Sequence, residues 1–228
     1  MKNLSSLIES IVYRNLDPGA RDWLTAKAAS VREETGGTQL ALAFTAMPRK
    51  TGKKDPGITE AEQQEAERDC KGLYIKDWTL DRLARVWLLM QADPADKNAY
   101  LKKIENLFSA AEMNELVALY SALPVLAYPE EWRGRCAEGI RSNIGIVLDA
   151  IIHRNPYPAE WLEEPAWNQL VMKAFFTDKD IRQISGLEKR ANKALSAILS
   201  DYARERQAAG RSVKPELREI EKLGGGGQ

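Results

Sequence analysis

The sequence predicts an all-α protein, built of antiparallel helix pairs that stack side by side into a compact, α-solenoid-like single domain. Apolar residues recur at spacings of three and four along most of the 228 residues, and this is the period of an amphipathic helix. No run of alternating β-branched residues is bounded by hairpin turn signals. The gaps between predicted helices are short, which favours antiparallel neighbours.

The first three helices are predicted from apolar residues at helical spacing and from residues that begin or end helices. An apolar stripe defines the first helix: Leu4, Leu7, Ile8, Ile11 and Val12. Asp17 can cap the second helix, and Pro18 suits its first position because the N–H there needs no partner. Thr38 can cap the third helix. We expect Pro48 to stop this helix, because proline lacks an N–H and disfavours helical backbone before it.

The segment 48–57, PRKTGKKDPG, is predicted to be a loop with four positive charges. It lacks the first glycine and the Ser/Thr of a phosphate-binding G-x-x-x-x-G-K-[ST] loop, so it is not such a motif. Two interpretations stay open. The loop is either a solvated basic segment or an anion-binding element in which Arg49, Lys50 and Lys53 act.

Capping boxes mark the next helices. Thr59 and Glu62 open an acidic helix that we expect to be exposed on one side. Thr79 begins a helix with apolar residues on more than one face, so this helix should be central. Two further helices follow and should form an antiparallel pair, the second of them capped by Ser109 and Glu112.

A long helix is predicted over residues 129–153. One of its faces would carry a row of residues separated by three or four positions: Glu138, Arg141, Gly145, Asp149 and His153. An imidazole beside a carboxylate, with a glycine leaving room for a ligand, could serve as a general acid/base site. The same row could equally be the solvated face of an amphipathic helix with ordinary ion pairs.

A corner with two prolines, RNPYP at residues 154–158, follows this helix. The prolines fix the direction of the chain, which suits a packed corner or a pocket wall. The next helix carries polar groups on its flank. If this flank faces the long helix, the candidate ligand-binding residues converge on one cavity: Glu138, Arg141, Asn143, His153, Arg154, Asn155, Asn168 and Lys173. Alternatively, Asn143 and Asn168 only satisfy backbone carbonyls at the corner.

Two more helices end the predicted domain, which spans residues 1–223. The first carries Leu195, Ile198, Leu199 and Tyr202 and stops at Gly210, and the last covers residues 215–223. The final GGGGQ, residues 224–228, has almost no side chains to pack and is expected to be a flexible tail outside the fold.

Composition excludes several classes of function. The 33 basic and 33 acidic residues leave a net charge of +0, so nucleic acid is not an expected partner. One histidine and two distant cysteines cannot supply a zinc site, and we expect no metal and no cofactor. The start of the chain has no secretory signal and no run is apolar enough to span a membrane, so we expect a cytoplasmic protein.

Four segments resemble the EboA-like family of bacterial and algal proteins: ELVALY at 115–120, AEGIRSN at 137–143, RNPYPAE at 154–160 and AWNQLVMKA at 166–174. With weaker matches on either side, the resemblance covers most of the chain. The segment 58–71 and the glycine-rich tail match least. The resemblance implies a gene cluster that accompanies the assembly of secondary metabolites, and in cyanobacteria the export of a pigment precursor. It provides no catalytic residues.

Three hypotheses follow. The first is a non-catalytic binding or adaptor protein, whose partner is another protein of the cluster or a small polar metabolite. The alternative is an enzyme for a polar or phosphorylated cyclic substrate, in which His153 or Glu138 is the general base and Arg49, Lys53 or Arg190 holds the anion. A scaffold that uses a flat helical surface is the third.

Overall fold

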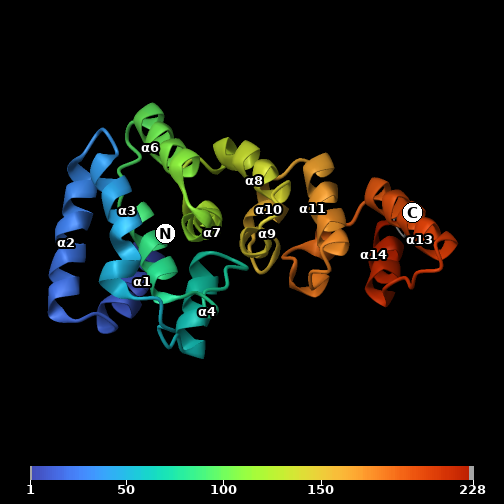
Figure 1. The fold of residues 1–228 in the computed structure, drawn as a ribbon, viewed down its shortest axis with the longest axis horizontal. Coiled ribbons are helices and arrows are strands. Elements are labelled where there is room, and N and C mark those ends of the chain that lie inside the picture. Colours follow the sequence, from blue (N-terminus) through green and yellow to red (C-terminus); the bar gives the residue numbers. More distant parts are fainter. Residues whose placement is uncertain (1, 226–228) are drawn as a thin grey trace.

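The chain folds into helices that follow one another along the long axis of the molecule (Figure 1). The computed structural model describes residues 2–225, and in that range it contains no β-strand, which confirms the predicted all-α class. The α-helices are α1 (Lys2–Arg14), α2 (Pro18–Glu33), α3 (Thr38–Thr51), α4 (Glu60–Asp69), α5 (Leu80–Leu89), α6 (Lys97–Ala110), α7 (Met113–Ala122), α8 (Arg133–Ile140), α9 (Gly145–Ile152), α10 (Tyr157–Trp161), α11 (Glu164–Phe176), α12 (Leu187–Arg190), α13 (Lys193–Ala208) and α14 (Pro215–Gly225). Three short 3-10 helices are η1 (Leu123–Val125), η2 (Pro129–Trp132) and η3 (Ile181–Gln183).

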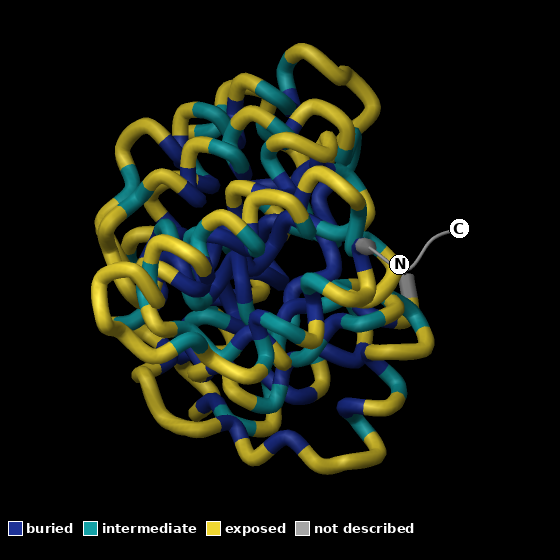
Figure 2. The backbone as a smooth tube through the Cα atoms, turned by 90° about the vertical axis from the view of Figure 1, so that its right-hand side faces the viewer, coloured by how far each residue is buried: buried dark blue, intermediate teal, exposed yellow. Residues whose placement is uncertain are grey.

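Helix α5 lies at the centre of the N-terminal half, as its apolar pattern predicts. It packs against α1, α3 and α7, and nine of its ten residues are buried. Figure 2 shows the buried backbone gathered in the middle of the molecule and the exposed backbone around it. The main packing partners of α7 are α5 and α9, so α6 and α7 do not form the close antiparallel pair that we expected.

Helix α3 does not stop at Pro48, so that prediction is wrong. The helix runs on to Thr51 with Pro48 inside it. A proline at this position leaves the carbonyl of Phe44 without its helical donor. The buried Arg85 of α5 replaces that donor, because its Nε donates to the Phe44 oxygen at 2.9 Å. A tertiary hydrogen bond therefore offsets the loss within the helix.

Local capping signals are mostly confirmed. The Asp17 carboxylate accepts from the backbone N–H of Ala20 at 2.8 Å, and Thr59 with Glu62 forms the predicted capping box. The predicted Ser109 cap is wrong, because Ser109 lies inside α6 and donates to the carbonyl of Glu105. Helix α7 instead begins after Glu112, where Glu112 and Glu115 form the capping box.

The long helix predicted over residues 129–153 is broken into η2, α8 and α9, so that prediction is also wrong. Helix α8 ends with tight backbone bonds, and the Ser142 hydroxyl accepts from the N–H of Ile144 at 3.1 Å. Such local bonds of serine compete with the helix. A Cβ on Gly139 would lie 2.5 Å from Ile151 Cδ1 and 2.6 Å from Tyr120 Cζ, so the bare glycine lets α8 fold closely onto α9 and α7.

The C-terminal helices α13 and α14 pack on each other as a hairpin at the end of the molecule (Figure 1). Helix α14 continues beyond the predicted end at residue 223. Gly224 is buried in it, and a Cβ there would lie 2.4 Å from the carbonyl oxygen of Asn192. Residues 226–228 of the expected tail lie outside the described residues.

Candidate functional site

The break of the long helix separates the predicted row of polar residues. Glu138 lies on α8, where Arg135 holds it at 2.8 Å, and the exposed Arg141 caps the end of α8. Both line one surface cavity of about 350 Å³ together with Tyr120, whose pKa burial raises to about 12. His153 lies beyond α9 and does not line that cavity. One shared acid/base row is therefore not formed.

Asn155 is a structural residue of the corner. It is buried, and its Nδ2 donates to the carbonyls of Tyr120 at 3.0 Å and Ala150 at 2.9 Å. Its Oδ1 accepts from the backbone N–H of Tyr157 at 3.0 Å. These bonds tie the start of α10 to α7 and α9, and they leave Asn155 with little capacity for a ligand.

Asn168 is also used within the protein. The Asn168 and Asn192 amides bond each other, with Asn192 Nδ2 donating to Asn168 Oδ1 at 2.9 Å. Asn192 is the N-cap of α13, where its oxygen accepts from Leu195 N–H at 2.8 Å. Asn168 thus orients the cap by which α13 begins next to α11. The predicted alternative, that this asparagine satisfies backbone carbonyls at the corner, does not describe it, because its partner is the side chain of Asn192.

Two other predicted residues meet at the surface. Lys173 Nζ donates to Asn143 Oδ1 at 3.0 Å, between α11 and the break that follows α8. Asn143 is exposed, so this contact bridges two elements in solvent. The structure therefore pairs Asn143 with Lys173 and does not bring either into a cavity with His153.

His153 and Arg154 share a second cavity, of about 260 Å³, between α5, α9 and the segment before α5. The His153 Nδ1 lies 3.4 Å from Asp149 Oδ1, and Lys179 holds the same carboxylate at 2.7 Å. Burial lowers the pKa of His153, an effect that outweighs the neighbouring Asp149. The imidazole is therefore neutral near pH 7 and can accept a proton.

Arg154 closes one side of this cavity. Its φ of 52° is in the left-handed region, and its N–H donates to the carbonyl of Gln183 at 2.7 Å. The guanidinium pairs with Asp77 at 2.8 Å and stacks 4.1 Å above the ring of Tyr74. A single isolated β-bridge between His153 and Ile184 holds the segment that follows η3 against the same corner.

The three predicted anion-binding residues do not form one site. Arg49 and Lys53 are exposed at the end of α3. Arg190 lies far along the chain, where it donates to the carbonyls of Ala159 and Leu162, both at 2.7 Å, and stacks over Trp167 at 5.2 Å. Arg190 thus caps the end of α10, so its guanidinium is largely committed to the protein.

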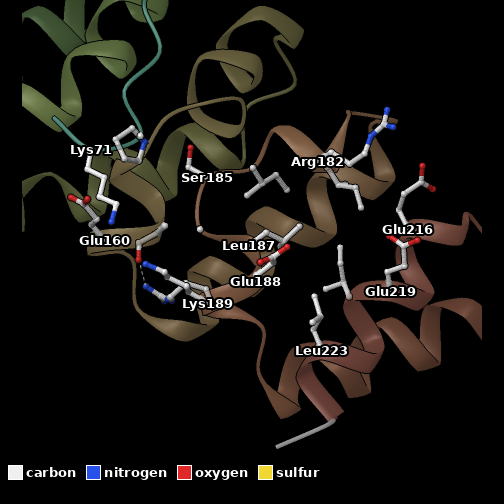
Figure 3. Close-up of a pocket in the computed structure, with 18 residues that line it drawn as sticks. Lys71, Glu160, Arg182, Ser185, Leu187, Glu188, Lys189, Glu216, Glu219 and Leu223 are labelled. Carbon is white, nitrogen blue, oxygen red and sulfur yellow. Dashed lines mark hydrogen bonds between the residues drawn. The ribbon is translucent and has the colours of Figure 1, made fainter. Parts of the chain in front are cut away.

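A cavity of about 620 Å³ lies at the seam between the corner, the segment 181–190 and α14. Figure 3 shows it with Leu187 near its centre and Leu223 of α14 below. Its apolar wall comes mostly from five residues: Ile181, Ile184, Leu187, Ile220 and Leu223. A cavity of this size, lined mainly by apolar groups, is typical of a small-molecule site.

Charged side chains surround this apolar wall. Lys71 and Glu160 lie on one side of the opening, and Glu216 and Glu219 of α14 lie on the other (Figure 3). Arg182 is also at the edge and pairs with Asp180 at 2.9 Å. The cavity can therefore surround an apolar body while its rim provides charges of both signs for polar groups.

The sequence does not reveal this cavity, because its residues come from segments far apart in the chain. One signal was present: Ile181, Ile184 and Leu187 are apolar residues in a stretch with glycine and no regular helical stripe. A second missed residue, Arg82, lines the His153 cavity. It is one of three charged residues, with Asp81 and Arg85, in an otherwise apolar α5.

Two further searches bear on the class of protein. Within residues 2–225, no cluster of three or more His, Cys, Asp or Glu side chains is arranged to hold a metal ion. The helices in the described part of the chain are too short or too polar to cross a membrane.

The fold and the cavity define an all-α protein of stacked helices with a sizeable apolar hollow near its C-terminal hairpin. The chain belongs to the EboA family: the model of this family, described as metabolite traffic protein EboA, matches residues 4–222. Curated proteins and solved structures gave no match. The family description thus associates the chain with metabolite traffic.

Proposed function

We propose that this chain is a non-catalytic binding protein of metabolite traffic, and that it holds a mainly apolar metabolite in the cavity at the seam. The observation that carries the proposal is the apolar wall of Ile181, Ile184, Leu187, Ile220 and Leu223 within about 620 Å³. The sequence alone suggested a small polar metabolite. The composition of the wall favours a molecule whose polar groups lie only at its edges.

The position of the cavity supports a carrier role. Its walls come from the body of the protein and from α14, so a bound molecule would contact both. Helix α14 is held on α13, which meets the body through α11. Occupation would therefore strengthen the docking of the hairpin, because a ligand stabilises the state that binds it. We further propose that the protein acts in the cytoplasm with other products of one gene cluster, during assembly or export of a precursor.

The binding step is tested with the neutral apolar dye N-phenyl-1-naphthylamine and the full chain. Leu187→Asp places a charge in the apolar wall, and we expect it to weaken dye binding about tenfold or more, since desolvating a carboxylate is costly. Leu42→Asp is the matched control, because Leu42 is 60% exposed on α3 and does not line the cavity. Equal binding by both variants and the wild type would refute the site.

The role in traffic is tested in producing cells. We expect cells that carry Leu187→Asp to retain inside the small molecules that the wild type releases, and cells that carry Leu42→Asp to release them normally. The measurement is the ratio of extracellular to intracellular metabolites by mass spectrometry. An unchanged ratio in the Leu187→Asp strain, with the variant protein present at the wild-type level, would reject a carrier role for this cavity.

The enzyme alternative stays a second candidate because of one observation. His153 opens into a cavity that also contains Asp149 and Arg154, so a base, a carboxylate and a cation meet there. Glu138, the other candidate base, lies in a different cavity. Consumption of a metabolite from cell extract by the wild type but not by His153→Gln would favour this alternative. Identical extracts after both incubations would exclude His153 as a general base.

A further inference from the structure

Arg82 has an unusual environment for an arginine. It lies on α5 and is the only residue of that helix that is partly and not fully buried. Its Nε donates to the Ser121 hydroxyl at 2.8 Å, and the guanidinium stacks 4.7 Å from the centre of the Trp78 ring. Within residues 2–225, no carboxylate lies within 4.0 Å of its guanidinium. Its two terminal nitrogens donate to no protein acceptor in that range.

The Arg82 side chain is protonated and positively charged at neutral pH. Burial lowers its pKa to about 10, and the residue stays protonated well above pH 7. A partly buried cation without an ion pair is costly, because the protein only partly replaces the water that solvated it. Proteins accept this cost most often where a ligand supplies the opposite charge.

The two carboxylates and two guanidinium groups that line the cavity of Arg82 cancel in charge, and Lys179, next to Asp149 but outside the lining, adds one positive charge. Asp77 is neutralised by Arg154 at 2.8 Å, and Asp149 is neutralised by Lys179 at 2.7 Å. His153 adds no charge because its imidazole is neutral. The buried His153 Nε2 has no partner within the protein. What is left of the local charge is the guanidinium of Arg82.

We propose that this cavity binds the anionic group of a small molecule, a carboxylate or a phosphate, with Arg82 as the main donor and Arg154 as the second. The planar guanidinium suits both groups, because its terminal N–H groups form two parallel bonds to their oxygens. The volume of about 260 Å³ leaves room for the anion and a few attached atoms. This site is separate from the apolar cavity, and neither proposal depends on the other.

The test uses thermal unfolding and calorimetry of the full chain with inorganic phosphate and with acetate, against chloride at equal ionic strength. We expect at least one of the two anions to stabilise the wild type. Arg82→Gln keeps a donor for Ser121 but removes the charge, and it should weaken binding of that anion about tenfold or more. Arg204→Gln is the control, since Arg204 is an exposed arginine on α13 that pairs with Asp201.

A second variant keeps the test decisive if Arg82→Gln fails to fold. Asp77 is 66% exposed and carries the negative charge that occupies Arg154. Asp77→Asn frees Arg154 and removes a repulsive charge, so we expect about threefold tighter binding of the same anion. A purely structural Arg82 would give no such gain. The proposal is overturned if neither anion binds, if Arg82→Gln binds as well as the wild type, or if Asp77→Asn brings no gain.

Discussion

Two arginines on α5, three residues apart and therefore neighbours on one face of the helix, have very different surroundings. Arg85 faces the packed core, where it contacts Asp81 at 3.1 Å, Glu115 at 3.6 Å and the Phe44 carbonyl at 2.9 Å. Arg82 faces a cavity and has no carboxylate partner. The difference teaches that a buried charge which the protein compensates belongs to the fold, whereas an uncompensated one points to a ligand.

The same contrast separates two larger regions. Around α5, helices α1, α3 and α7 close on one another through buried apolar side chains. At the seam, the hairpin of α13 and α14 meets the rest of the protein mainly through α11, and the apolar cavity of about 620 Å³ lies beside this contact. Tight packing supplies stability in the first region. Incomplete packing supplies space for a ligand in the second.

The largest effect should come from removing the compensated arginine. Arg85→Met leaves the Asp81 and Glu115 carboxylates buried without their cation, and we expect a loss of about 3–5 kcal/mol in the free energy of unfolding. Arg82→Gln should change this free energy by less than about 1 kcal/mol, because no buried carboxylate loses its partner. Urea denaturation of both variants measures the two values. Equal losses would break the contrast between the two arginines of α5.

Alkaline pH should act on the packed region next. Burial raises the pKa of Tyr100 and of Tyr120 to about 12, from the usual value near 10. The unfolded chain loses these protons first, so stability is complete below pH 10 and falls as the pH rises toward 12. Each tyrosine contributes a slope of about 1.4 kcal/mol per pH unit in that window. Urea denaturation between pH 9 and 12 measures the slope, and Tyr100→Phe should reduce it by one such increment.

The smallest effect should be confined to the hairpin. In Gly224→Ala the new Cβ would meet the Asn192 carbonyl, so we expect the docking of α14 on α13 to weaken by about 1–2 kcal/mol. Hydrogen exchange should then be faster in α14 and unchanged in α5. Gly134→Ala is the matched control, because a Cβ at Gly134 on α8 meets no atom within 4 Å. Faster exchange in α5 as well would show that the two regions unfold together.

Apolar stripes and capping residues predicted the helices well, because these patterns act between residues that are close in the sequence. The stripe from Leu4 to Val12, the Asp17 cap and the box of Thr59 with Glu62 all act over one or two turns, and the structure has each of them. The errors occur where a distant residue changes the outcome. Pro48 stays within α3 because Arg85, 37 positions later, supplies the missing donor.

The candidate site was harder to predict than the helices. In the sequence, Glu138 and His153 fall in one row of polar residues at helical spacing. The apolar residues of α8 and α9 also follow that spacing, so the two helices look like one. Only the fold shows that Gly139 lets one helix turn back against the other. His153 and Arg154 do share a cavity, whereas Asn155 and Asn168 are used within the protein.

The sequence by itself determined the helical class and most helix boundaries, because spacing, caps and prolines act through neighbouring residues. Tertiary structure alone decided which polar groups are satisfied and where space is left. Those properties depend on residues from distant segments, as Arg82 and His153 line one cavity and Ile184 and Leu223 line another. An ion pair or a cavity is formed by residues from several distant segments, so no local sequence pattern predicts it.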